Sequence, residues 1–118
     1  MRHGRRVRKL NRPADQRRAM LRALTTRVLT DGRATTTRAR AKELRRRVDR
    51  IVTLAKRGGQ HAHRIALRYV YDRHVLRELF RWAPHRYRAR NGGYTRLVRV
   101  AETRRGDNAQ LATVELCD

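Results

Sequence analysis

The chain has 118 residues, with 32 Lys or Arg against 10 Asp or Glu, so its formal net charge is +22 at pH 7. No apolar run approaches the roughly 20 residues of a membrane span, and no apolar stretch follows the charged N-terminus, so we expect neither a membrane-spanning helix nor a secretory signal. The single cysteine, Cys117, excludes an internal disulfide and a cysteine-based zinc site, and it is typical of a reducing compartment.

The Lys and Arg residues near the N-terminus predict a basic arm over residues 1–12. The length of the chain predicts one domain, over residues 13–118. The arm shows no apolar periodicity, and Lys and Arg dominate its charge. We therefore expect it to be disordered when free and to fold against a polyanion.

Apolar residues at three- and four-residue spacing predict a helix over about residues 14–30, capped by Asn11 or a neighbour. A short strand at residues 33–36 is expected next, followed by a second helix over about residues 37–57 that begins at a capping threonine. The apolar stripe of this second helix consists of Ala41, Leu44, Val48, Ile51, Val52 and Ala55.

Two shorter helices are predicted over about residues 61–71 and 73–83. Asp72 is a candidate cap for the later one, and Pro84 is expected to end it. Among the aromatic residues of these helices, Tyr69 and Phe80 are expected in the core because they fall at helical spacing.

Beyond these helices, β-branched and aromatic residues predict a hairpin of strands over residues 94–101 and 111–117. Residues 33–36 are available as a third strand. The predicted fold class is α/β (α+β), with four helices packed on a small, mostly antiparallel three-stranded sheet and a basic N-terminal arm.

Enzymatic chemistry is not indicated by any constellation in the chain. His61 and His63 are two residues apart, so they would face different sides of a helix, whereas a metal pair needs a spacing of three or four. The acids form no recognisable pair, and Gly92-Gly93 lacks a phosphate-binding fingerprint. We expect a non-enzymatic protein without a metal, a cofactor or a small-molecule substrate.

Basic residues carry the functional signal. There are 29 Arg and only 3 Lys, and a planar guanidinium suits phosphate and base contacts, although a GC-rich genome gives the same skew. Because the charge is spread around a small domain, we expect embedding among RNA helices through phosphate and shape contacts. The first alternative is a general nucleic-acid-binding compaction protein, and the second is a membrane-active basic protein.

Two segments allow two interpretations each. Residues 106–118 contain three acids and no Lys or Arg, so they form either a solvent-facing hairpin edge or a face turned toward basic neighbouring proteins. Tyr94 follows two glycines and precedes Arg96, so its ring either stacks on a nucleotide or packs over the glycines.

Several motifs resemble the family of the seventeenth protein of the bacterial-type large ribosomal subunit, over essentially the whole chain. These motifs are Lys9-Leu10-Asn11-Arg12, Arg40-Ala41-Lys42-Glu43-Leu44-Arg45, Gly92-Gly93-Tyr94-Thr95-Arg96 and Arg105-Gly106-Asp107-Asn108-Ala109. Residues 13–17 are similar to the cyanobacterial and plastid branch, whereas residues 61–64 depart from the paired arginines usual in the family.

The resemblance implies a structural protein of the large ribosomal subunit that binds large-subunit rRNA near the surface around the peptide exit region. It also implies neighbouring ribosomal proteins as partners, in the bacterial cytoplasm or the plastid stroma. By position, the resemblance implies that the following residues bind rRNA: Arg2, His3, Arg5, Arg6, Arg8, Lys9, Asn11, Arg12, Arg38, Lys42, Arg45 and Arg46. Charge and aromatic character add Arg17, Arg18, Arg90, Tyr94, Arg96, Arg104 and Arg105.

Overall fold

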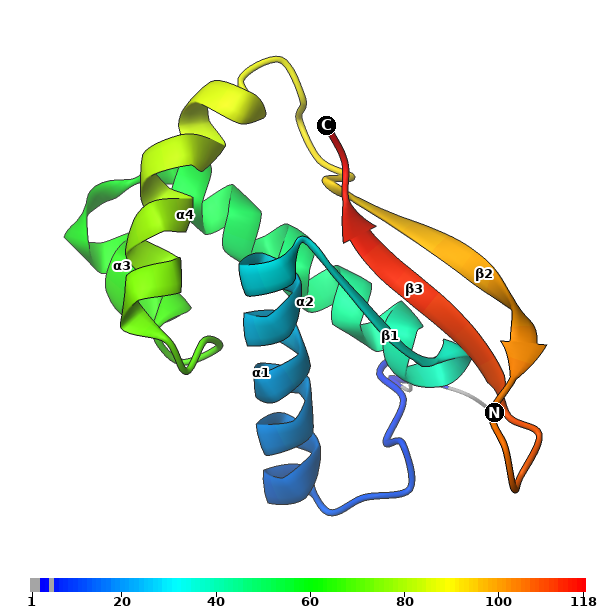
Figure 1. Cartoon of the computed structure of the whole chain (residues 1–118). Helices are drawn as coiled ribbons and strands as arrows, with labels where there is room; N and C mark the ends of the chain where they lie inside the picture. The colour runs from blue at the N-terminus through cyan, green and yellow to red at the C-terminus, as the bar shows by residue number, and fades with distance from the viewer. Residues whose placement is uncertain (1–2, 5) are drawn as a thin grey trace.

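The computed structural model describes residues 3–4 and 6–118. Its helices and strands follow in the order α1 (Ala14–Asp31), β1 (Arg33–Thr37), α2 (Arg38–Arg57), α3 (Gly59–Ala66), α4 (Arg73–Arg86), β2 (Thr95–Thr103) and β3 (Gln110–Leu116) (Figure 1). The strands form one antiparallel sheet in the order β1-β3-β2. The predicted α+β fold class is therefore confirmed.

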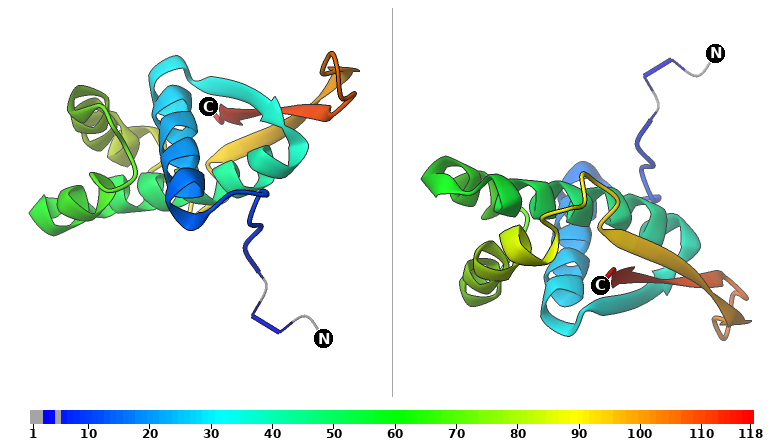
Figure 2. Two further views of the ribbon diagram at one scale, coloured as in Figure 1. Left: turned by 90° about the horizontal axis from the view of Figure 1, so that it is seen from below. Right: turned by 90° about the horizontal axis from the view of Figure 1, so that it is seen from above.

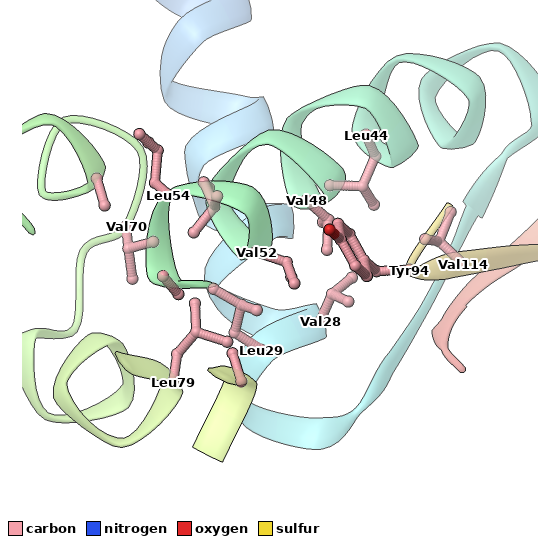
Figure 3. Packing of buried hydrophobic residues seen from close by; sticks show 14 of the residues in the cluster. Val28, Leu29, Leu44, Val48, Val52, Leu54, Val70, Leu79, Tyr94 and Val114 are labelled. Atoms are coloured by element: carbon pink, nitrogen blue, oxygen red, sulfur yellow. The ribbon is translucent and has the colours of Figure 1, made fainter. Parts of the chain in front are cut away.

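Helix α2 is the central element of the fold, because it contacts every other helix and strand. Figure 2 shows α2 running along the molecule, with the sheet at one end, α3 and α4 at the other, and α1 crossing between them. The predicted apolar stripe of α2 is buried in full, and Figure 3 shows Val48 and Val52 in one core with Val28 of α1 and Val114 of β3. The exposed face of the same helix is left to its basic side chains.

Helix α1 begins and ends close to the predicted positions, but its first residue is not capped by Asn11. Pro13 occupies the N-cap position without a side-chain hydrogen bond, and its carbonyl accepts from the Arg17 amide at 2.9 Å. Asn11 instead has a φ of 55°, which belongs to a left-handed turn. Gly32 ends the helix with a φ of 82°, and its amide donates to the Val28 carbonyl at 2.8 Å.

Helix α3 starts two residues earlier and ends five residues earlier than predicted. The following turn is fixed from α1, since the Arg22 guanidinium donates to the carbonyls of Leu67 at 2.9 Å and Val70 at 3.2 Å. These contacts span more than 40 residues of sequence. Local periodicity therefore could not report the end of this helix.

Helix α4 confirms the Asp72 cap, whose carboxylate accepts from the amides of His74 at 2.9 Å and Val75 at 3.4 Å. Pro84 does not end the helix, which continues to Arg86. A proline this close to the C-terminus costs only one hydrogen bond of the last turn, and the Tyr87 amide still donates to the Ala83 carbonyl at 3.0 Å.

The hairpin of β2 and β3 confirms the predicted strands, with shifted ends, and β1 is the expected third strand. In the register, Ala34 faces Val114 and Leu97 faces Val114 from the other side, so this row packs on α2. Cys117 follows β3 and is 8% exposed, so its side chain packs as a small apolar residue.

The aromatic core differs from the prediction. Tyr69 and Phe80 are half-buried and pack against the core from its edge, whereas Tyr87 and Tyr94 are buried within it. Both buried tyrosines flank the irregular segment between α4 and β2, where no periodicity exists to reveal them.

Candidate nucleic-acid interface

The described part of the arm lies beside the N-terminal half of α2 and is held there by two of its side chains. The Arg8 amide donates to Glu43 Oε1 at 3.3 Å, and Arg46 Nη1 donates to the Arg6 carbonyl at 2.9 Å. Glu43 is 6% exposed. Figure 2 shows the arm leaving the molecule on the side of α2 opposite the sheet.

A tight turn connects the arm to α1. Leu10 and Asn11 both adopt positive φ angles, and the Arg12 amide donates to the Lys9 carbonyl at 3.2 Å. Arg17 closes the turn, because its Nη1 donates to the carbonyls of Lys9 at 3.4 Å and Arg12 at 3.2 Å. The arm is thus attached to both α1 and α2.

An open groove with a volume of about 1080 Å³ lies between the arm and α2. Its lining consists of Gly4, Arg6, Val7, Arg8, Lys9, Arg17, Lys42, Glu43 and Arg46. The only carboxylate among these residues is Glu43, which is buried and accepts from the arm. The groove therefore presents a concentration of cations, which suits the phosphates of a nucleic acid.

Two smaller hollows extend this groove along α2, and both include Lys42. One, of about 350 Å³, adds Arg38, and the other, of about 430 Å³, adds Arg45 and reaches Leu97 of β2. A further hollow joins Arg38 to Arg99 of the hairpin. The basic surface is therefore continuous from the arm, over α2, to the edge of the sheet.

Asp49 of α2 lines the hollow with Lys42 and Arg45 and hydrogen-bonds to the start of β2. Its Oδ1 accepts from the Tyr94 amide at 3.1 Å and from Thr95 Oγ1 at 3.0 Å. Burial raises the pKa of the Asp49 carboxyl, although the hydrogen bond from Thr95 and the charge of Arg45 oppose this rise. Sequence reasoning missed this residue because its partners lie 45 and 46 positions away.

Lys56 is a second residue that sequence reasoning missed, and it organises the segment around the paired glycines. Its Nζ donates to the Arg90 carbonyl and to Tyr94 Oη, the latter at 3.1 Å. The side chain of Arg90 stays exposed and donates to the Gly93 carbonyl at 3.3 Å.

Tyr94 does not present a face to a nucleotide. It is 2% exposed, and its ring centroid lies 5.0 Å from that of Tyr87. The structure therefore contradicts the stacking interpretation and favours core packing.

The hairpin carries arginines that already have acidic partners. Arg96 Nε lies 3.6 Å from Glu115 Oε1 across the strand pair. At the turn, Arg104 Nε donates to Asp107 Oδ1 at 3.1 Å, and this hydrogen bond lowers the pKa of Asp107 to about 2. The same hydrogen bond raises the pKa of Arg104. These arginines offer less free charge than those of the groove.

The three acids of the C-terminal segment each lie near an arginine. Asp107 and Glu115 have the partners described above, and Asp118 Oδ1 lies 3.9 Å from Arg86 Nη2. Neither interpretation of residues 106–118 included these ion pairs, because their arginines, Arg86, Arg96 and Arg104, lie outside the segment.

Comparison with known families identifies the family of the protein that carries this basic surface. The family model described as Ribosomal protein L17 matches residues 20–117 of the chain. The chain belongs to the ribosomal protein L17 family. It is therefore a structural, non-enzymatic protein of the large ribosomal subunit that binds rRNA.

The matched region of this L17 protein starts within α1, so it includes the basic face of α2 but not the arm. Among the described residues, no helix is long and apolar enough to cross a membrane. The described residues also contain no cluster of His, Cys, Asp and Glu that could hold a metal ion.

The structure brings some of the predicted rRNA-binding residues together and separates others. Those that line the groove or its neighbouring hollows are Arg6, Arg8, Lys9, Arg17, Arg38, Lys42, Arg45 and Arg46. Those exposed in the arm or on α1 outside that lining are His3, Asn11, Arg12 and Arg18. Those exposed on the glycine segment or the hairpin are Arg90, Arg96, Arg104 and Arg105. Arg2 and Arg5 lie outside the described residues.

Proposed function

We propose that this L17 protein holds large-subunit rRNA in the groove between the arm and α2, through phosphate and shape contacts. The observation that carries the proposal is the lining of the groove, where six Lys or Arg accompany one buried carboxylate. Phosphate contacts of this kind fix position and neutralise charge without reading base sequence. Arg38, Arg45 and Arg99 extend the same path beyond the groove.

Glu43 and Arg46 support this role because they use the arm's backbone instead of its side chains. The Arg8 amide and the Arg6 carbonyl are bound to α2, which leaves both guanidinium groups for phosphates. A partly preorganised arm loses less conformational entropy when it binds.

A salt titration of binding to isolated large-subunit rRNA tests the groove. The variant Lys9→Gln/Lys42→Gln removes two exposed groove cations, and Arg64→Gln/Arg77→Gln removes two exposed cations from α3 and α4. The affinity falls as salt rises, so the slope of log K against log salt is negative. Each lost phosphate contact should reduce the magnitude of this slope by about one. We expect the groove variant to reduce the magnitude of the slope by about two and the control variant to leave it nearly unchanged.

Equal losses for both variants would show that charge acts without regard to position. That result, together with equal affinity for duplex DNA, would favour the alternative of a general nucleic-acid-binding compaction protein. The groove proposal would then be wrong.

We further propose that the protein lies near the surface of the large subunit around the peptide exit region, beside other ribosomal proteins. The proposal is supported by the family resemblance of the sequence motifs. A tagged copy should sediment with large subunits in a sucrose gradient, even after a high-salt wash. Electron microscopy of those subunits should then show the tag near the exit region, and a tag at any other place would contradict the proposal.

The compartment of this ribosome is proposed to be the bacterial cytoplasm or the plastid stroma, again from the resemblance. Fractionation of cells that produce the protein should recover it with ribosomes of one of these two compartments. Recovery with any other ribosome population would contradict the proposal.

A further inference from the structure

Tyr71 is the one aromatic residue of this protein whose side chain is largely exposed. It is 52% exposed, whereas the other five aromatic residues, all within the described part of the chain, are buried or half-buried. Tyr71 lies in the turn between α3 and α4, and Figures 1 and 2 place this turn on the opposite side of α1 from the arm. It is therefore separate from the groove.

Arg22 of α1 covers one face of the Tyr71 ring. The central carbon of its guanidinium lies 4.2 Å from the ring centroid, which is the distance of a close cation–π contact. Its Nη2 is bound to the carbonyls of Leu67 and Val70, so the guanidinium cannot easily swing away. One face of the ring is thus occupied by a fixed cation.

The backbone of Tyr71 is fixed to the same helix. Its amide donates to Thr26 Oγ1 at 3.0 Å, and that hydroxyl donates to the Arg22 carbonyl at 2.9 Å. The cation–π contact with Arg22 stabilises one face of the ring, but it does not account for the exposed part of the side chain. Its exposure is better explained by a planar partner on the open face.

The charges around this ring suit a nucleotide. Arg68 and Arg73 flank Tyr71 in the chain, and Arg18 lies one helical turn before Arg22 on α1; all three are exposed. The neighbouring acid, Asp72, caps α4 with its carboxylate. Their places in the turn, at the start of α4 and on α1 make these arginines candidates to contact the phosphates of a nucleotide stacked on the ring.

We propose that the open face of Tyr71 stacks on an unpaired nucleobase of the large-subunit rRNA, with Arg22 behind the ring. This inference rests on the rRNA binding of the family, and it adds a contact outside the proposed groove. The base is unpaired because bases within a duplex already stack on their neighbours. Recognition is tolerant of sequence, since every base has a π face.

The variants Tyr71→Ala and Tyr71→Phe test this contact in the full chain with isolated large-subunit rRNA. Loss of one stacked base should weaken binding roughly fivefold to a hundredfold in Tyr71→Ala. Tyr71→Phe keeps the ring and should bind like the unchanged protein. The salt slope should be the same for all three proteins, because stacking neutralises no phosphate.

Chemical probing of the rRNA gives a local readout of the same contact. One unpaired nucleotide should be protected by the unchanged protein and by Tyr71→Phe, and it should become reactive with Tyr71→Ala. Ultraviolet irradiation of the unchanged complex should cross-link that nucleotide to the peptide that contains Tyr71, which requires no variant to fold.

Equal affinity of Tyr71→Ala, or a cross-link from Tyr71 to a ribosomal protein in whole subunits, would overturn the stacking proposal. Binding by the unchanged protein in the same assay, with the reduced salt dependence of Lys9→Gln/Lys42→Gln, would show that the groove function stands nonetheless. Failure of the unchanged protein to bind the rRNA would overturn both.

Discussion

Asp49 illustrates how one carboxylate joins the central helix to the sheet. Burial raises its pKa, so the native state holds this proton more tightly than the unfolded chain does. The stability that protonation contributes is present below the unfolded pKa of about 3.8 and is lost as the pH rises through the raised native value. At neutral pH, burying the ionised Asp49 carboxylate lowers the stability of the native state, and the two hydrogen bonds that it accepts offset part of this loss.

The variants Asp49→Asn and Asp49→Ala separate the charge from the hydrogen bonds. Asn keeps an acceptor for the Tyr94 amide and Thr95 Oγ1, so Asp49→Asn should gain stability relative to the unchanged protein between pH 4 and pH 7. Asp49→Ala leaves two buried donors without a partner and should lose about 1–3 kcal/mol. Urea unfolding at both pH values measures this, and a higher free energy of unfolding for Asp49→Ala than for the unchanged protein at pH 7 would contradict the assignment.

At the scale of elements, the N-cap of α4 is a clean case for measurement because Asp72 is exposed and its only described role is to accept from two amides. Asp72→Ala should lower the free energy of unfolding by about 1 kcal/mol, while Asp72→Asn should change it by much less. Urea unfolding at pH 7 measures both variants. An equal loss in the two would mean that the negative charge, not the cap, matters.

The arm is an element whose order depends on few contacts. Its described hydrogen bonds to α2 are a half-buried one of 3.3 Å from the Arg8 amide to Glu43 and an exposed one of 2.9 Å from Arg46 to the Arg6 carbonyl. We predict that amides of residues 2–12 exchange quickly in the free protein and that the Arg8 amide slows on rRNA binding. Glu43→Ala should reduce this slowing, and Glu43→Gln, which keeps an acceptor, should preserve it. Protection in the free protein equal to that of α2 would refute the prediction.

The elements also show where sequence patterns carry enough information and where they do not. Every residue of the predicted apolar stripe of α2 is buried, because that face meets neighbours along its length, although Glu43 and Leu54 are buried as well. The end of α3 depends on Arg22, and the burial of Tyr94 involves Asp49 and Lys56. Tyr87 donates its hydroxyl to the Cys117 carbonyl, 30 positions away. Such contacts leave no local period to detect.

At the scale of the whole molecule, the same distinction applies to the candidate site. Composition predicts a polyanion partner, and the motifs predict the family, which the family match confirms. The groove could not be predicted, because it exists only where Glu43 and Arg46 bring the arm beside Lys42. Likewise, the pairing of Arg96 and Arg104 with acids is a property of the folded hairpin.

The net charge of +22 makes the stability of the whole molecule depend on its ionic surroundings. The five ion pairs among the described residues lie at the surface, where water and salt screen such pairs and they contribute little to stability. Repulsion among the excess cations therefore dominates, and screening should relieve it. Raising NaCl from about 0.01 M to about 1 M shortens the Debye length from about 30 Å to about 3 Å and should raise the urea midpoint.

The variant Arg64→Gln/Arg77→Gln, which removes two exposed cations, should show a smaller rise in the urea midpoint with salt than the unchanged protein. A midpoint that falls with salt would mean that the surface ion pairs outweigh the repulsion. Large-subunit rRNA should stabilise the chain beyond what NaCl achieves, because it binds the native state and adds its binding free energy to that of folding. The rRNA then acts as part of what keeps this small, highly charged core folded.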